Sequence, residues 1–173
     1  MSIPQKIIVS VSSDLSTDQR VQKVCTSLAN HGFDVQLLGR KLTNSSTFSS
    51  NLYKAKRFTL WFNRGFLFYA NLNVALFFKL LFSKFDVLYA NDLDTLTANF
   101  LVSKITGKPL IYDSHEYFTE VPELVSRPSV QRIWVRIEKT ILPKLKNCIT
   151  VTEQIANVYK VNADRFQESK NYA

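Results

Sequence analysis

Short apolar runs rich in β-branched residues alternate with longer segments of helical periodicity along most of the chain. This alternation constrains the fold strongly, because strands separated by helices pair in parallel through right-handed crossovers. Polar residues, glycines and prolines stand between the runs and mark the turns. The apolar runs predict strands at residues 6–12, 34–39, 55–62, 86–90, 109–113 and 148–151.

The segments between these strands carry apolar side chains at helical spacing. They predict helices over residues 18–30, 65–84, 94–106 and 129–147, and from residue 153 onward. The fold class expected is therefore α/β, a doubly wound, Rossmann-like and mostly parallel sheet with helices on both faces. At 173 residues the chain has the size of one domain. We assign residues 1–160 to that domain, and residues 161–173 to the start of an interdomain connection or to a C-terminal tail.

The net charge of +8 favours an anionic partner, which nucleic acid, a sugar nucleotide or an acidic membrane would supply. Nucleic acid is not expected, because RNA-binding sheets place aromatic side chains on exposed strands with basic edges. Cys25 and Cys148 lack metal-ligand spacing, so we expect no metal site. Free cysteines and an N-terminus without a signal-peptide pattern predict a cytoplasmic protein, with peripheral attachment to the inner membrane face left open.

Residues 53–85 are both basic and aromatic. The uncharged run within them, residues 65–78, is too short to cross a bilayer, which needs about 20 apolar residues. A helix that lies in the membrane interface, with rings at the acyl boundary and cations at the phosphates, suits this composition. We expect one face of the helix to pack on the sheet and the other to face an anionic membrane surface or a bound substrate.

Ligands of doubly wound sheets bind at the C-terminal ends of the strands. Four polar loops of this chain follow such ends, and they contain the candidate substrate-binding residues Ser13, Asp14, Asn91, Asp92, Asp113, Glu116, Thr152 and Glu153. His115 lies among them, directly after a hydrophobic strand, and can donate and accept hydrogen bonds near neutral pH. A functional histidine and a solvated residue of a helix start are equally compatible with this segment.

Two further patterns at these loops have structural interpretations. Asp92 and Asp94 form an Asp-x-Asp triplet that resembles a divalent-metal site, but Asp94 stands where a helix must begin, so we expect it to cap that helix. The first loop, residues 12–20, contains no glycine, which argues against a dinucleotide cofactor or a Walker loop there, and no cofactor is expected. Arg20, just inside the first helix, could contact an anion or a carboxylate, but a surface ion pair is the more frequent fate of such a residue.

With these residues placed, the chain resembles the N-terminal, acceptor-side domain of the GT-B glycosyltransferases, in particular the retaining enzymes of family 4. The resemblance covers residues 6–160. It is carried by four segments in a fixed order: TDQRVQKVCTSLANHGFDVQLLGR (17–40), FDVLYANDLDTL (85–96), PLIYDSHEYF (109–118) and ITVTEQIA (149–156).

The resemblance implies that this domain holds a glycan or lipid-linked acceptor, while a second, C-terminal domain grips the nucleotide-sugar donor. It implies that His115 is the catalytic residue, approaching the transferred sugar, and that Asn91, Asp92 and the turn at Ser13 line the same cleft. Such enzymes rely on the leaving diphosphate and on positioning rather than on a protein nucleophile. The chain departs from many relatives in lacking a double glycine in its first loop.

The family's donor contacts fall beyond residue 173, so we expect these 173 residues alone to be inactive. Two other functions stay open at this point. The first is half of a nucleotide-sugar 2-epimerase, an enzyme with the same two-domain architecture. The second is a non-catalytic, membrane-associated binding module.

Overall fold

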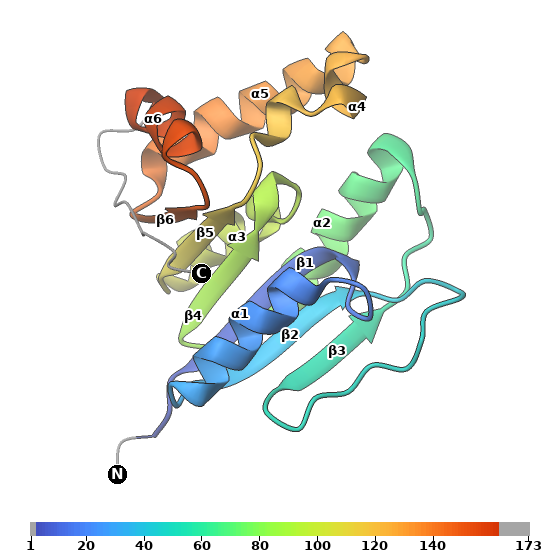
Figure 1. The fold of residues 1–173 in the computed structure, drawn as a ribbon, viewed down its shortest axis with the longest axis vertical. Helices are drawn as coiled ribbons and strands as arrows, with labels where there is room; N and C mark the ends of the chain where they lie inside the picture. Colours follow the sequence, from blue (N-terminus) through green and yellow to red (C-terminus); the bar gives the residue numbers. More distant parts are fainter. Residues whose placement is uncertain (1–2, 163–173) are drawn as a thin grey trace.

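The computed structural model describes residues 3–162, which form a six-stranded sheet with helices on both faces (Figure 1). Residues 163–173, most of the segment assigned to an interdomain connection, lie outside the described residues. The strands are β1 (Lys6–Asp14), β2 (Asp34–Arg40), β3 (Lys54–Phe58), β4 (Val87–Asn91), β5 (Leu110–Ser114) and β6 (Asn147–Thr150).

All neighbouring strands pair in parallel, in the order β3-β2-β1-β4-β5-β6. This confirms the predicted doubly wound, Rossmann-like sheet. The chain builds outward in one direction from β1 to β3 and then returns to place β4 on the other side of β1. The strand order therefore reverses between β1 and β4, the point at which ligands bind in sheets of this kind.

The helices divide into those that cover one face of the sheet and those that cover the other. They are α1 (Gln19–Asn30), α2 (Gly65–Leu81), α3 (Asp92–Thr106), α4 (Pro122–Val125), α5 (Pro128–Ile141) and α6 (Glu153–Asn162), with 3-10 turns η1 (Phe118–Glu120) and η2 (Leu142–Lys144). Figure 1 shows α1 in front of the sheet and α2 and α3 behind it.

Alternate residues of β1 explain these two layers, because successive side chains of a strand point to opposite faces. Val9 packs with the buried Val21 and Cys25 of α1 in one core. Ile8 packs with the buried Leu72 and its neighbours of α2 in the other. Both layers are closed by apolar contacts. Many of the buried polar residues lie at the C-terminal strand ends, among them Asp14, Asn91, Asp113, Ser114 and Thr150.

Several predicted boundaries were wrong: β1 continues to Asp14 rather than ending at residue 12, and α2 ends at Leu81 rather than at residue 84. β3 ends at Phe58 rather than at residue 62, because the chain then turns and the Trp61 N–H donates to Asn71 Oδ1 of α2 at 2.9 Å. α5 ends at Ile141 rather than near residue 147, since Pro143 opens a 3-10 turn and cannot continue the helical hydrogen bonding. α3 begins at Asp92 rather than at Asp94.

A candidate active site at the C-terminal strand edge

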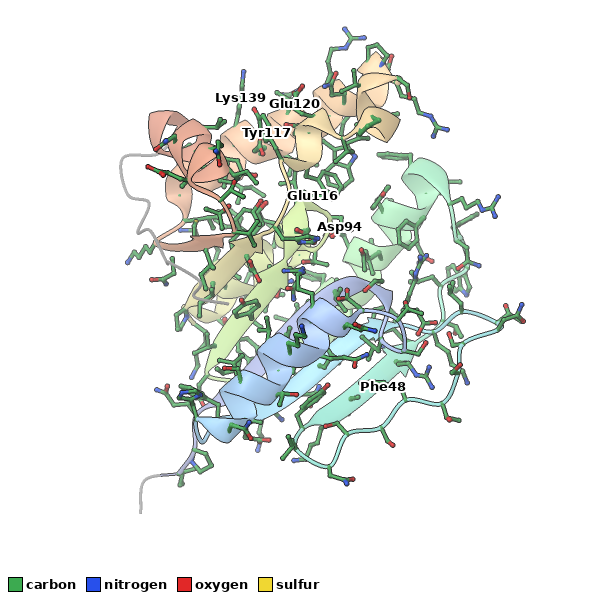
Figure 2. All side chains as sticks on the ribbon, in the orientation of Figure 1. Phe48, Asp94, Glu116, Tyr117, Glu120 and Lys139 are labelled. Atoms are coloured by element: carbon green, nitrogen blue, oxygen red, sulfur yellow. The ribbon has the colours of Figure 1, made fainter. Side chains whose placement is uncertain are left out.

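Side chains from β4, β5 and the start of α1 meet where the strand order reverses. We call the group formed by Arg20, Asn91, Asp92, Asp94, Asp113 and His115 the β4–β5 cluster. Its members come from three parts of the chain, and parallel pairing brings them together because the ends of β4 and β5 lie side by side, with Asn91 opposite Asp113. Figure 2 shows the side chains of Asp94 and Glu116 in this region, between α1 and α5.

Arg20 is the centre of the β4–β5 cluster. Its Nη1 donates to Asp113 Oδ2 at 3.1 Å, and its Nη2 donates to Asn91 Oδ1 at 3.3 Å and lies 3.5 Å from Asp92 Oδ2. A planar guanidinium suits this role, because its several N–H groups reach different acceptors at once. The surface ion pair expected for Arg20 was wrong: its partner Asp113 is 4% exposed.

Asp113 is buried at the end of β5 and accepts a second hydrogen bond. The Tyr89 hydroxyl donates to its Oδ2 at 2.9 Å. Burial raises the pKa of Asp113 above its ordinary value, and the charge of Arg20 opposes that rise. Neither Arg20 nor Tyr89 was among the predicted site residues. Arg20 carried the better sequence signal, because the first turn of a helix that follows β1 must stand at this edge.

His115 lies against Asp92. Its Nδ1 is 2.5 Å from Asp92 Oδ1, and its backbone N–H donates weakly to the same oxygen at 3.4 Å. Burial lowers the pKa of His115, but the adjoining Asp92 carboxylate outweighs burial and raises the pKa above the ordinary value. Nδ1 is fully covered while the side chain as a whole is 32% exposed, so the exposed surface belongs to other atoms of the side chain.

Asp92 adopts a backbone conformation that is uncommon for a residue other than glycine. Its φ is +60°, the only positive φ of a non-glycine residue in the described part of the chain. Aspartate tolerates this left-handed region better than most residues, yet the conformation is strained and persists only where surrounding contacts hold it. Arg20 and His115 supply contacts to both carboxylate oxygens of Asp92.

Asp94 does not cap α3, and the prediction that it would do so was wrong. The N-cap residue is Asn91, and Asp94 lies inside the first turn, buried, with no partner for its Oδ1 among the described residues. Burial raises the pKa of Asp94 to about 7, a contact with Ser12 opposes that rise, and the charges of Asp92 and Glu116 reinforce it. The carboxyl group is thus poised to be neutral or charged near physiological pH.

Asp14 and Ser13 are at the end of β1 but do not join the β4–β5 cluster. Asp14 Oδ1 accepts from Ser16 N at 3.0 Å and Ser16 Oγ at 2.8 Å, while Oδ2 accepts from Ser45 Oγ. Arg57 Nη1 lies 3.9 Å from the same carboxylate. These residues, Asp14, Ser16, Ser45 and Arg57, are called the β1 cluster below. Ser13 Oγ donates to Asp18, the N-cap of α1, at 2.5 Å.

The remaining predicted site residues border the edge without direct contacts to the β4–β5 cluster. Glu116 is exposed, and its backbone oxygen accepts from Ser114 Oγ at 2.9 Å. Thr152 and Glu153 are exposed at the start of α6, where Thr152 Oγ1 accepts from the Ile155 N–H at 3.3 Å. Between residues 3 and 162, no group of three or more His, Cys, Asp or Glu side chains is arranged to hold a metal ion.

Comparison with solved structures shows which fold this is. One structure of sucrose-phosphate synthase from Thermosynechococcus elongatus aligns over 98% of this chain and 89% of its own, with a TM-score of 0.69 and 14% identity. A second structure of that enzyme aligns over 96% of this chain and 47% of its own, with a TM-score of 0.71 and 15% identity. HepE from Anabaena, in complex with UDP and glucose, aligns over 98% of this chain and 45% of its own, with a TM-score of 0.59 and 15% identity.

The chain thus spans about half the length of the latter two structures, and at these identities the likeness establishes the fold alone. No curated protein sequence matches the chain significantly. The sequence profile of Glycosyltransferase Family 4, in contrast, matches residues 18–164, which is most of the chain. The protein therefore belongs to Glycosyltransferase Family 4 and has the fold of the N-terminal domain of GT-B glycosyltransferases.

Proposed function

We propose that this domain is the acceptor-binding half of a retaining glycosyltransferase that transfers a sugar from a nucleotide-sugar donor to a glycan or lipid-linked acceptor. The family assignment supports the reaction class. The observation that carries the site is the contact of His115 with Asp92, which Arg20 holds in turn. This chain of contacts fixes one nitrogen of the imidazole and leaves the exposed part of the side chain for a ligand.

His115 then acts by hydrogen bonding rather than as a nucleophile. A cationic or neutral imidazole can bind a hydroxyl of the transferred sugar and favour the geometry in which the glycosidic bond breaks. The adjoining Asp92 carboxylate raises the pKa of His115 above its ordinary value and so favours the protonated ring. Positioning and electrostatic stabilisation of the leaving diphosphate supply the remaining catalysis in this proposal.

The donor is a nucleotide sugar held mainly by a second domain. Two observations support this: the chain aligns with about half of HepE, and that structure contains UDP and glucose. We propose that residues 1–173 alone do not turn over. The buried, unbonded Cys25 and Cys148 support a reducing, cytoplasmic location.

A transfer assay tests the proposal. A protein that joins this domain to its donor domain should transfer sugar from one of a panel of UDP- and GDP-sugars, with retention of the anomeric configuration by NMR, whereas residues 1–173 should not. His115→Ala should lower turnover by about 100-fold or more, the scale of lost acid–base or hydrogen-bond catalysis. His31→Ala, which removes the exposed histidine at the end of α1, is the matched control.

Three results would contradict the proposal. Turnover by residues 1–173 alone would remove the need for a donor domain. Release of an epimerised nucleotide sugar in place of a transfer product would assign the protein to the epimerases. Near-normal turnover of His115→Ala would remove His115 from the catalytic residues.

A further inference from the structure

The outward face of α2 is apolar although it is not covered by any other described element. Phe66, Leu67, Val74 and Phe78 are 52–58% exposed, and Phe82, directly after the helix, is 82% exposed. Leu67, Val74, Phe78 and Phe82 recur at intervals of seven and four residues, so they lie along one side of the helix. The opposite side, with Phe68, Leu72, Leu76 and Leu80, is buried in the core. α2 is therefore apolar on two faces, of which the sheet covers one.

The polar side chains of α2 do not interrupt this outward face. Asn71 Oδ1 accepts from the Trp61 N–H, and Asn73 donates to the backbone oxygens of Tyr69 and Asp94 and accepts from Ala98 N. Both amides are therefore engaged within the fold. The bond to Asn71 also fixes the turn that carries Trp61, which is 90% exposed. We call Trp61, Phe66, Leu67, Val74, Phe78 and Phe82 the α2 face.

The segment that carries the α2 face has charges of one sign only. Residues 53–85 contain six lysines and arginines and no aspartate or glutamate. Arg64 precedes the helix and Lys84 follows it, and both are exposed. Cations at the ends of an apolar helix face suit a surface that offers hydrocarbon beneath a layer of negative charge. A second copy of this chain suits the face less well, because it would bring like charges together.

Between residues 3 and 162, no helix has both the length and the apolar character needed to cross a bilayer. At 17 residues, α2 is about 25 Å long, so a helix that lies flat presents several rings to the acyl boundary. We propose that the α2 face docks the protein on an anionic phospholipid bilayer, with the phenyl and indole rings at the acyl boundary and Arg64 and Lys84 at the phosphates. This docking does not depend on sugar transfer.

Vesicle binding tests the proposal without any enzymatic readout. Residues 1–173 should co-sediment with vesicles of phosphatidylcholine and phosphatidylglycerol at low salt, and far less with phosphatidylcholine alone or at high salt. The chain has two tryptophans, and Trp134 is buried, so a blue shift of fluorescence on binding reports on Trp61. Trp61→Phe should abolish that shift, since it removes the exposed indole.

Paired substitutions separate the apolar from the charged contribution. Phe78→Ser with Phe82→Ser should lower partitioning of the protein onto anionic vesicles about tenfold or more, because both rings leave water when the native chain binds. Leu52→Ser, which alters an exposed apolar residue outside the α2 face, should change it by less than about twofold. Arg64→Gln and Lys84→Gln should each lower binding to anionic vesicles about fivefold.

Several outcomes would overturn the proposal. They are failure of the chain to bind anionic vesicles at low salt, equal binding to both kinds of vesicle, or undiminished binding of the Phe78→Ser, Phe82→Ser variant. Concentration-dependent dimers that this variant abolishes, measured by analytical ultracentrifugation, would make the α2 face an interface between copies of the chain. Because no sugar transfer is measured, these results leave the proposed enzymatic function untouched.

Discussion

Two clusters of charged residues lie at the same edge of one sheet, and they differ in how completely their carboxyl groups are hydrogen-bonded. In the β1 cluster, both oxygens of Asp14 accept hydrogen bonds from Ser16 and Ser45. Burial raises the pKa of Asp14, but these hydrogen bonds outweigh it and lower the pKa to about 2. In the β4–β5 cluster, one oxygen of Asp94 has no partner among residues 3–162, and Asp92 has a strained backbone.

The difference indicates which cluster serves the fold and which serves a ligand. Asp14 holds the loop that contains Ser45 against the end of β1, and both of its carboxylate oxygens accept hydrogen bonds there. Buried carboxyl groups with raised pKa values and strained backbone are unfavourable for folding, and they concentrate at functional sites. We therefore propose that the active site lies at the β4–β5 cluster and that the β1 cluster stabilises the fold beside it.

Asp94→Asn should give the largest difference between the two clusters. The folded-state pKa of Asp94 is about 7 and the ordinary value is 3.8, so the folded state holds this proton more tightly than the unfolded state. The protonated Asp94 therefore makes a favourable contribution to the free energy of unfolding that is complete below about pH 4 and is lost as the pH rises through 7. The asparagine variant should therefore be more stable than the native chain by about 2–4 kcal/mol near pH 8, and nearly equal to it near pH 4.

Asp14→Asn is the matched control and should have the opposite sign. The pKa of Asp14 is lowered, so its contribution is present above about pH 4 and lost as the pH falls through 2. Removing the charge should lower the free energy of unfolding by about 1–2 kcal/mol at neutral pH. Denaturant titrations over a range of pH measure both variants, and effects of the same sign would contradict the distinction between the clusters.

Arg20→Lys should have the next largest effect. A lysine ammonium cannot contact Asp113, Asn91 and Asp92 together. The buried Asp113 carboxylate would then lose part of the contact that offsets the cost of its burial. We expect a loss of about 1–2 kcal/mol in the free energy of unfolding.

Arg57→Lys makes the same change in the β1 cluster. Arg57 lies 3.9 Å from Asp14, whose oxygens have other donors, and its Nη1 donates to the Ser46 backbone oxygen at 2.7 Å. Only this one bond depends on Arg57, so the loss should stay below about 1 kcal/mol and below that for Arg20→Lys. Urea denaturation of the two variants measures both losses. A larger loss for Arg57→Lys would show that Arg20 is not the main support of the buried carboxylates.

Local patterns were sufficient to predict the fold, because each strand and helix is marked by nearby residues. The alternation of apolar runs predicted all six strands and the parallel sheet, and the rule for C-terminal strand ends predicted that Asn91, Asp92, Asp113 and His115 would share one edge. Boundaries failed where one hydrogen bond to a neighbouring helix or a single proline decides them, as at Phe58 and Pro143.

The internal arrangement of the site was not predictable from local patterns. Arg20 is 93 residues from Asp113 in sequence, and nothing near Arg20 indicates that pairing. Periodicity also does not reveal a left-handed residue, so the start of α3 at Asp92 and the burial of Asp94 were missed. Backbone strain and unpartnered atoms arise only when distant segments pack together.

The histidine pKa tests the central claim, that Asp92 holds His115 at the site. The chain has two histidines, so NMR titration of the imidazole resonances follows His115 directly, with His31 at the other end of α1 as an internal control. Asp92→Asn keeps the side-chain shape and tolerates the left-handed backbone while removing the charge. We predict that the pKa of His115 lies above its ordinary value in the native chain and falls in Asp92→Asn. An unchanged or higher pKa in the variant would contradict the claim.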